Sequence, residues 1–181
     1  FFERTRKVFH RKTLATRVPG AGLQRYTYAD YADRVCRLAA ALQRLGLKKG
    51  ERVGTFAWNS HRHMEVYFAA PLMGMVLHTV NIRLSPQDIT YIVNHAEDRV
   101  LIVDASLWPL LEPIKNDLKS VKHFIVMKDS PSAEMPSGAL GYEALLADAR
   151  PVEDWPKLEE TDAAGMCYTS GTTGHPKGVL Y

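Results

Sequence analysis

The sequence predicts an α/β fold in which a mostly parallel sheet is flanked by helices, and two observations carry this prediction. Segments with apolar residues at helical spacing alternate along the chain with short apolar segments, as is typical of strands joined by helical crossovers. The short segments are apolar at consecutive positions, as expected of parallel strands buried on both faces. The expected strands are 52–57, 75–80, 100–103, 124–127, 165–168 and 178–181.

The clearest expected helix covers 27–45. Thr27 can cap its N-terminus, Asp30 follows three residues later, and Gly46 is a natural stop. Apolar residues recur between them at spacings of three and four. Further helices are expected from Ser60, with Met64, Tyr67, Phe68 and Leu72 on one face, from Ser85-Pro86, over 107–118 with a kink at Pro113, and over 141–149.

Composition is that of an ordinary soluble folded domain. The 181 residues are 46% hydrophobic and 24% charged, with a net charge of +3 that is spread along the chain. This charge is too small and too scattered to indicate a nucleic acid partner. No stretch reaches the roughly 18 apolar residues of a transmembrane segment, and no signal peptide is visible, so a cytoplasmic location is expected. Cys36 and Cys167 are expected to be buried free thiols.

The most informative segment is 169–178, between two expected strands, which reads Thr-Ser-Gly-Thr-Thr-Gly-His-Pro-Lys-Gly. Glycines allow tight turns that bring backbone N–H groups against a ligand, and successive N–H groups form an anion-binding concavity. The hydroxyls add donors, and Lys177 adds a positive charge. The segment is therefore predicted to bind the phosphates of a nucleotide. A plain hairpin turn would explain neither the four hydroxyls nor the lysine.

Two other nucleotide-binding patterns fail on residues and on context. The P-loop has a glycine before its lysine and a Ser or Thr after it, on a strand-to-helix turn, whereas Lys177 follows Pro176 and leads into an expected strand. The dinucleotide fingerprint should follow a sheet strand, yet 58–60, 81–83 and 104–106 are not glycine-rich. A nicotinamide or flavin enzyme is therefore disfavoured.

Residues 168–178 resemble the signature of the adenylate-forming superfamily of AMP-binding enzymes. This group holds acyl-CoA and aryl-CoA ligases, firefly-type luciferases and the adenylation domains of peptide synthetases. Every motif position from Thr169 to Lys177 is matched, and His175 falls at a position that varies in the family.

Further similarity narrows the group. Segments 58–63, 76–84 and 92–98 are similar to bacterial medium- and long-chain fatty acyl-CoA ligases (synthetases), although Ile82 stands where these enzymes usually carry proline. The resemblance covers 26–181. It implies that the chain is the first part of an N-terminal AMP-binding (adenylation) domain. The remainder of that domain and the C-terminal lid domain would lie outside 1–181, so the piece alone is expected to be inactive.

The resemblance implies an ATP-dependent fatty acid–CoA ligase that uses ATP, Mg²⁺ and coenzyme A. A fatty acid carboxylate would attack the α-phosphorus of ATP, giving acyl-adenylate and pyrophosphate, and the coenzyme A thiol would then displace AMP. Magnesium, lysine and oriented N–H groups would offset the repulsion between the two anions. Dimers occur in the family, which leaves a homodimer open.

For the site, the resemblance implies that the loop wraps the β- and γ-phosphates. Lys177 and Thr172 are the expected catalytic residues, with Lys177 near the departing pyrophosphate, and Thr169 resembles a hydroxyl that contacts the metal. Gly178, like the two loop glycines, is expected to serve backbone shape. The whole set expected to bind ATP is Thr169, Ser170, Gly171, Thr172, Thr173, Gly174, His175, Pro176 and Lys177.

The other histidines lack metal-ligand spacing. His61, His63, His78 and His95 are therefore expected to be structural, and His175 is expected to face solvent at the tip of the loop. Two alternatives stay open. One is an aryl-CoA ligase or a peptide-synthetase-type adenylation domain, which the acyl pocket would discriminate. The other is a truncated, non-catalytic binding module.

Overall fold

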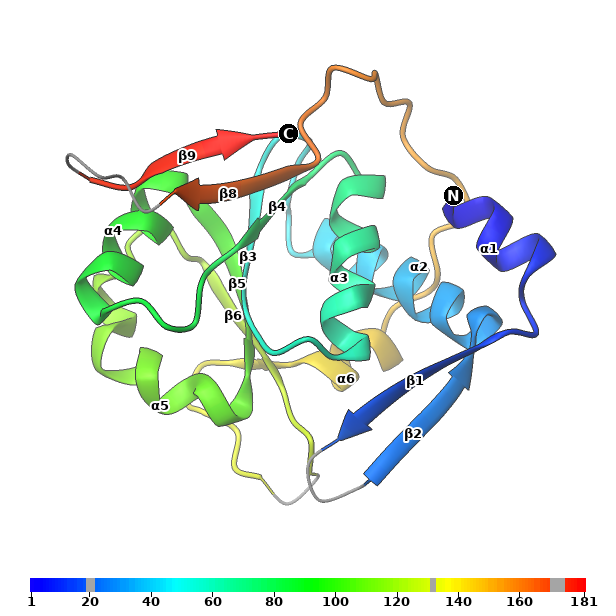
Figure 1. The fold of residues 1–181 in the computed structure, drawn as a ribbon, viewed down its shortest axis with the longest axis horizontal. Helices are drawn as coiled ribbons and strands as arrows, with labels where there is room; N and C mark the ends of the chain where they lie inside the picture. Colours follow the sequence, from blue (N-terminus) through cyan, green and yellow to red (C-terminus); the bar gives the residue numbers. More distant parts are fainter. Residues whose placement is uncertain (19–21, 131–132, 170–174) are drawn as a thin grey trace.

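A central sheet organises the chain in this computed structural model, which describes residues 1–18, 22–130, 133–169 and 175–181. The strands are β1 (Thr13–Val18), β2 (Gly22–Thr27), β3 (Arg52–Phe56), β4 (Val76–Thr79), β5 (Asp98–Asp104), β6 (His123–Met127), β7 (Leu140–Gly141), β8 (Gly165–Thr169) and β9 (Lys177–Leu180). Within the described residues, seven of them form one sheet of order β7-β6-β5-β3-β4-β8-β9 (Figure 1). Its strands are parallel except β9, which runs antiparallel to β8, and β1 pairs with β2 separately.

The helices are α1 (Phe2–Val8), α2 (Tyr28–Arg44), α3 (His61–Leu72), α4 (Pro86–Ala96), α5 (Trp108–Leu111) and α6 (Tyr142–Ala147), with 3₁₀ turns at Ala105–Leu107 and Glu112–Asp117. Two of the helices, α2 and α4, begin at the caps that the sequence predicts. The Thr27 hydroxyl accepts the N–H of Asp30, whose carboxylate accepts the N–H of Thr27, which makes a capping box. Ser60 and Ser85 cap α3 and α4. The expected helix 107–118 instead divides into α5 and a 3₁₀ turn, because Pro113 supplies no N–H donor.

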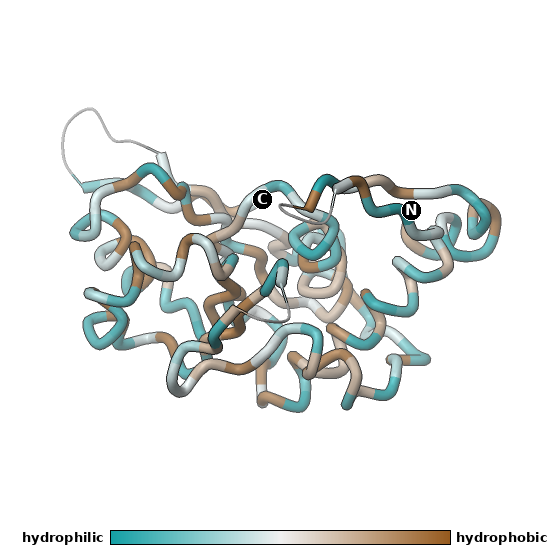
Figure 2. The backbone as a smooth tube through the Cα atoms, turned by 90° about the horizontal axis from the view of Figure 1, so that it is seen from below, coloured by the Kyte–Doolittle hydropathy of each residue, from teal (hydrophilic) through white to brown (hydrophobic). Residues whose placement is uncertain are grey.

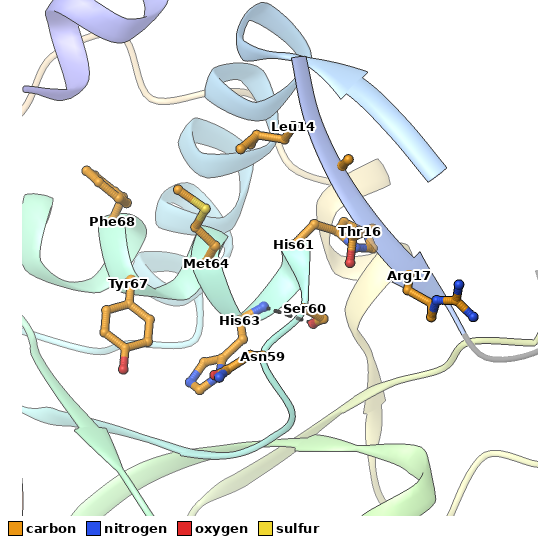
Figure 3. A pocket seen from close by; sticks show the side chains of 11 residues that line it. Leu14, Thr16, Arg17, Asn59, Ser60, His61, His63, Met64, Tyr67 and Phe68 are labelled. Carbon is orange, nitrogen blue, oxygen red and sulfur yellow. Dashed lines mark hydrogen bonds between the residues drawn. The ribbon is translucent and has the colours of Figure 1, made fainter. Parts of the chain in front are cut away.

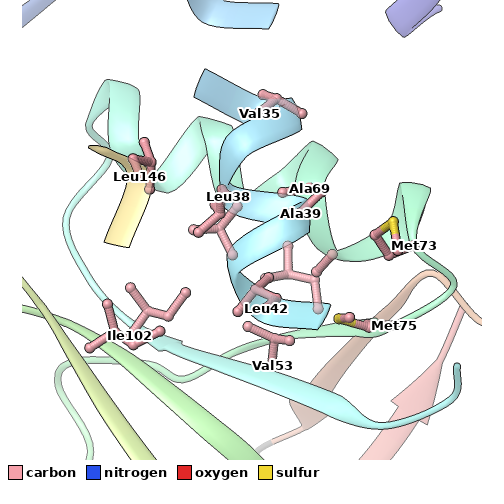
Figure 4. Close-up of a cluster of buried hydrophobic side chains, with 14 of the residues drawn as sticks. Val35, Leu38, Ala39, Leu42, Val53, Ala69, Met73, Met75, Ile102 and Leu146 are labelled. Carbon is pink, nitrogen blue, oxygen red and sulfur yellow. The ribbon is translucent and has the colours of Figure 1, made fainter. Parts of the chain in front are cut away.

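Helices cover both faces of the sheet, with α1, α2, α3 and α6 on one side and α4 and α5 on the other (Figure 1). Side chains of β5 alternate between the two layers: Val100 and Ile102 join the first cluster, and Leu101 and Val103 join the second. Figure 4 shows part of the first cluster, in which Leu42 of α2 faces the strands. The predicted α/β fold with a mostly parallel sheet is confirmed, and so is the reason for the consecutive apolar residues.

Two expectations about burial are wrong. Met64 and Tyr67, placed on the apolar face of the expected helix, are 39% and 49% exposed, and α3 turns Val66 and the carboxylate of Glu65 inward instead. Glu65 can be buried because Arg34 and the Tyr142 hydroxyl contact its carboxylate. Cys167 is exposed, since it lies beside the edge strand of the sheet. Hydrophilic and hydrophobic residues alternate along the peripheral helices (Figure 2), as amphipathic packing requires.

Four short elements, α1, β1, β2 and β7, were not expected from the sequence. Helix α1 is held by one buried side chain, Phe2, whose ring packs edge-to-face on Trp155 at 5.6 Å between centroids. Trp155 belongs to the segment 150–164, which contains no helix or strand and leads back past α1 to β8 (Figure 1). Among the described residues, no helix is both long and apolar enough to cross a bilayer.

A buried carboxylate joins three helices. The Glu65 side chain is 0% exposed and lies 2.7 Å from Arg34 Nε of α2, and it accepts the Tyr142 hydroxyl of α6 at 2.7 Å. The Tyr26 hydroxyl donates to it at 3.2 Å, while Arg34 also reaches Glu143 at 2.8 Å. Burial raises the pKa of Glu65, and the contact with Arg34 opposes that shift. The network fixes α2, α3 and α6 together on one face of the sheet.

Candidate nucleotide-binding site

The predicted phosphate loop connects β8 to β9. Thr169 ends β8 and Lys177 begins β9, the two are paired across the antiparallel ladder, and the Thr169 hydroxyl donates to the Lys177 carbonyl at 3.5 Å. Both residues and His175 are exposed, while Pro176 is half-buried. The other predicted residues, Ser170, Gly171, Thr172, Thr173 and Gly174, lie outside the described residues. The loop is therefore followed by a strand, β9, and not by a helix, in agreement with the sequence argument against a P-loop.

The loop starts at the edge of the sheet where ligands bind in open α/β folds. Strands β3, β4, β5, β6 and β8 are parallel, so their carboxyl ends lie at one edge, and that edge is the usual place for a ligand. At the end of β5, the carboxylate of Asp104 accepts the N–H of Trp58 at 2.6 Å. Burial raises the pKa of Asp104 to about 6, and that hydrogen bond opposes the shift.

Two aromatic residues of α4 contact the residues that flank the loop. Tyr91 stacks on His175 with centroids 4.8 Å apart and an interplanar angle of 26°. Tyr91 also stacks on His95 at 5.2 Å, and His95 Nδ1 lies 2.6 Å from the hydroxyl of Tyr168. Burial, with a smaller contribution from the charge of Asp98, raises the pKa of Tyr168 to about 12, so the hydroxyl keeps its proton at neutral pH. His175, expected to face solvent at the tip, is exposed but packed on a ring.

Beneath Tyr168 lies a fully buried pair. His78 Nδ1 and Asp98 Oδ2 are 2.7 Å apart, with both side chains 0% exposed, and the His78 ring lies 5.1 Å from the Tyr168 ring. Burial raises the pKa of Asp98, and the hydrogen bond with His78 opposes the shift. Within the described part of the chain, His78 Nε2 and Asp98 Oδ1 have no hydrogen-bond partner. The pair supports Tyr168 from below.

Gly178 leaves room for the Tyr168 ring, because it has no side chain. It is not among the described glycines with positive φ, so the reason for glycine at this position is not a left-handed backbone conformation. A Cβ at this position would lie 3.1 Å from the Tyr168 ring, which crosses over it from the paired strand. Sequence reasoning missed Tyr91 and the roles of His95 and Tyr168. The available signal was the pair Tyr91 and His95, four residues apart on one face of an amphipathic helix.

Replacing Gly54 by alanine is expected to lower the free energy of unfolding by about 1–3 kcal/mol. A Cβ on Gly54 of β3 would lie 2.8 Å from Asp98 Oδ2 and 2.8 Å from Leu101 Cδ1, both buried, so the pair beneath Tyr168 would have to shift. Urea unfolding measures the effect. Gly165→Ala is the control, because its Cβ would meet nothing closer than the Leu77 carbonyl at 3.8 Å. An equal loss in both variants would contradict this explanation.

A separate pocket of about 520 Å³ lies between β1 and the amino end of α3 (Figure 3). Arg17 and Met64 are among its lining residues, and none of the predicted phosphate-binding residues that the structure describes lines it. Burial, followed by the charge of Arg62, lowers the pKa of His61 in its wall to about 4. Neighbouring His63 lies 3.0 Å from the Thr55 hydroxyl. This pocket is distinct from the described residues that flank the loop.

Known proteins match the chain along its whole length. The AMP-binding enzyme family matches residues 2–181. A long-chain-fatty-acid–CoA ligase of Thermus thermophilus is 48% identical over 182 residues, covering 100% of this chain and 32% of the relative. A 3-methylmercaptopropionyl-CoA ligase of Ruegeria lacuscaerulensis is 42% identical over 176 residues, covering 96% and 33%.

Solved structures agree. The anthranilate CoA ligase AuaEII in complex with anthranoyl-AMP superimposes with a TM-score of 0.87 and 27% identity, covering 99% of this chain and 33% of that one. The chain thus spans about one third of the length of the proteins that it matches. The family match, the motif between β8 and β9 and the mostly parallel sheet lead to the same conclusion: the chain belongs to the family of AMP-binding enzymes.

Proposed function

We propose that this chain is the phosphate-binding part of an ATP-dependent fatty acid–CoA ligase. The observation that carries the proposal is the hydroxyl- and glycine-rich motif, which joins β8 to β9 at the carboxyl edge of the sheet and ends in Lys177. Identity of 48% to a long-chain-fatty-acid–CoA ligase supports a fatty acid as the substrate. Residues 1–181 would be the first part of the AMP-binding domain, and the rest of the longer protein would supply the acyl pocket and the lid domain.

The proposed reaction has two steps. A fatty acid carboxylate oxygen attacks the α-phosphorus of ATP, the bond to the β-phosphate oxygen breaks, and acyl-adenylate and pyrophosphate form. The thiol of coenzyme A then attacks the acyl carbon, loses its proton, and displaces AMP to give the thioester. A carboxylate is a poor acyl donor, and the mixed anhydride supplies a good leaving group. ATP and coenzyme A as substrates favour a cytoplasmic location.

In this proposal, Lys177 stabilises the negative charge on the departing pyrophosphate. It is exposed at the start of β9 and pairs with no carboxylate among the described residues, so its charge is available to a phosphate. Thr172 would act beside it. The loop hydroxyls and N–H groups would orient the β- and γ-phosphates, which lowers the cost of developing charge because the donors are already in place.

Magnesium fits this arrangement with the phosphates as its main ligands. In the described ranges no three His, Cys, Asp or Glu side chains gather to hold a metal, but Mg²⁺ commonly takes one or two protein oxygens together with substrate phosphates. The exposed hydroxyl of Thr169 at the start of the loop is the oxygen that we assign to it. When bound, the ion would neutralise charge on the phosphates.

Pyrophosphate release by the full-length protein tests the proposal. The assay contains ATP, Mg²⁺ and, separately, fatty acids of graded length, aryl acids and amino acids. Release that depends on a fatty acid supports the ligase proposal. Release only with an aryl acid would instead indicate an aryl-CoA ligase, and the similarity to the 27% identical anthranilate ligase is consistent with that outcome. Release only with an amino acid would indicate an adenylation domain. ATP binding without release for any acid would indicate a non-catalytic binding module.

A further inference from the structure

We propose that four residues form an aromatic clamp, Tyr91 and His95 of α4 with Tyr168 and His175, that positions the phosphate loop from both of its ends. The proposal rests on the proposed function. According to this proposal, helix α4, which lies outside the signature motif, helps to align ATP. These four are positioning residues, because they would act through the loop.

The first step of the argument is that one helix holds both ends of the loop. Tyr168 precedes Thr169 and bonds to His95, with 2.6 Å between the hydroxyl and Nδ1. At the other end, His175 stacks on Tyr91 at 4.8 Å. Tyr91 and His95 stand four residues apart and stack on each other at 5.2 Å, so they lie side by side on one helical turn. Helix α4 therefore fixes both ends of the loop, in addition to the pairing of Thr169 with Lys177 in the sheet.

The second step is that α4 is a rigid support. It begins with a Ser85 cap and a proline in its first turn, and Ile89, Ile92 and Val93 are fully buried in the second cluster. Figure 1 shows α4 beside the ends of β8 and β9 that flank the loop. A side chain on a packed helix keeps its place relative to the sheet better than one on a loop.

The third step is that Tyr168 is enclosed on three sides. His95 holds its hydroxyl, the His78 ring lies 5.1 Å from its ring, and the backbone of Gly178 lies under it. His78 is in turn fixed by the buried carboxylate of Asp98 at 2.7 Å. The residue immediately before the loop cannot move without breaking contacts with α4, β4 and β9 together.

These contacts matter for the first half-reaction and not for the second. Adenylation uses the β- and γ-phosphates that the loop would hold, and alignment of reacting groups is sensitive to displacements of about 1 Å. Thioester formation from acyl-adenylate and coenzyme A involves neither of those phosphates. Loosening the clamp should therefore weaken ATP binding and slow adenylation, and leave the second half-reaction unchanged. A general loss of structure would lower both.

The experiment uses the full-length protein with Tyr168→Phe, which removes the hydroxyl and keeps the ring, and Tyr91→Leu, which removes the stacking platform. Three quantities are measured: ATP binding without acid, acid-dependent pyrophosphate release, and thioester formation from synthetic acyl-adenylate and coenzyme A. Tyr168→Phe is expected to weaken ATP binding by about fivefold, the equivalent of one hydrogen bond. Tyr67→Phe, the same change at a half-exposed tyrosine of α3, is the control and should bind ATP like the parent.

His95→Phe completes a double-mutant cycle, since it keeps a ring for Tyr91 and removes Nδ1. The double variant with Tyr168→Phe should bind ATP no more weakly than either single variant. Additive losses, equal loss in both half-reactions, or unchanged ATP binding in Tyr168→Phe and Tyr91→Leu would overturn the clamp. If the parent binds ATP but releases no pyrophosphate with any acid, the ligase proposal fails, and the binding measurements still decide on the clamp.

Discussion

Lys177→Ala in the full-length protein is expected to lower fatty-acid-dependent pyrophosphate release by about tenfold or more, because it removes a positive charge where the departing pyrophosphate gathers negative charge. Lys177 has no carboxylate partner among the described residues, and its contacts with Thr169 are made by its backbone, so the alanine variant should keep them. Its side chain projects from the first residue of β9, opposite Thr169. The measurement is the rate of release at saturating and at limiting ATP, with the unfolding midpoint recorded alongside.

Three further variants distinguish the loss of the Lys177 charge from the effect of removing any exposed side chain. Lys177→Arg keeps the charge but presents a planar fork in place of a compact ammonium, so it should recover part of the activity. Thr172→Ala should also reduce release. Lys157→Ala, at a side chain 90% exposed on the segment before β8, should leave the rate unchanged. Equal rates in Lys177→Ala and the parent would show that the loop does not handle phosphates as proposed.

Glu65→Ala is expected to lower the free energy of unfolding by about 3 kcal/mol, because it breaks a buried ion pair and removes the nearer acceptor of the buried Tyr142 hydroxyl, which keeps only the long contact of 3.4 Å with the Arg62 carbonyl among the described residues. The side chain is 0% exposed and is held by Arg34 and by the hydroxyl of Tyr142, a residue that is itself 1% exposed. Arg34 retains its contact with Glu143 in the variant, which limits the loss. Urea unfolding followed by circular dichroism measures it.

Glu143→Ala is the matched control. It removes a carboxylate from the same arginine, Arg34, and also from Arg62, which keeps Asp129 as a partner at 2.7 Å. The Glu143 side chain is 49% exposed, and exposed ion pairs contribute little. The expected loss is therefore much smaller than for Glu65→Ala. Glu65→Gln, which keeps an acceptor for the Tyr142 hydroxyl, should fall between the two. A loss in Glu143→Ala as large as that in Glu65→Ala would contradict the explanation from burial.

Much of the fold could be predicted because local signals and tertiary packing agree. The Thr27 cap and the apolar stripe of α2 both survive in the structure, and β5 is apolar throughout its centre because helices cover both of its sides. Strand β2 could not be found this way, since its first four residues are exposed and carry no apolar period. Helix α1 was missed because it depends on Phe2 meeting Trp155, a contact that no local pattern encodes.

The site divides in the same way. The phosphate motif is contiguous, so its residue types alone point to phosphate binding. The contact between His95 and Tyr168 joins residues 73 positions apart, and no periodicity in the sequence relates them. The buried Glu65 was equally out of reach, because a carboxylate is ordinarily exposed and only the three-dimensional partners Arg34 and Tyr142 account for its burial.

The order of strands in the sheet also affects the order in which the chain folds. Strand β3 pairs with both β4 and β5, so the sheet centre can form once those three strands have been synthesised. Strand β8 pairs with β4, although β5 to β7 and the segment after α6 lie between the two strands in the sequence. Two residue pairs join them, Leu77 with Gly165 and His78 with Met166. Closing so long a loop for so few contacts is slow and reversible. The antiparallel pair β8 and β9, which flanks the phosphate motif, is thus expected to join the folding sheet last.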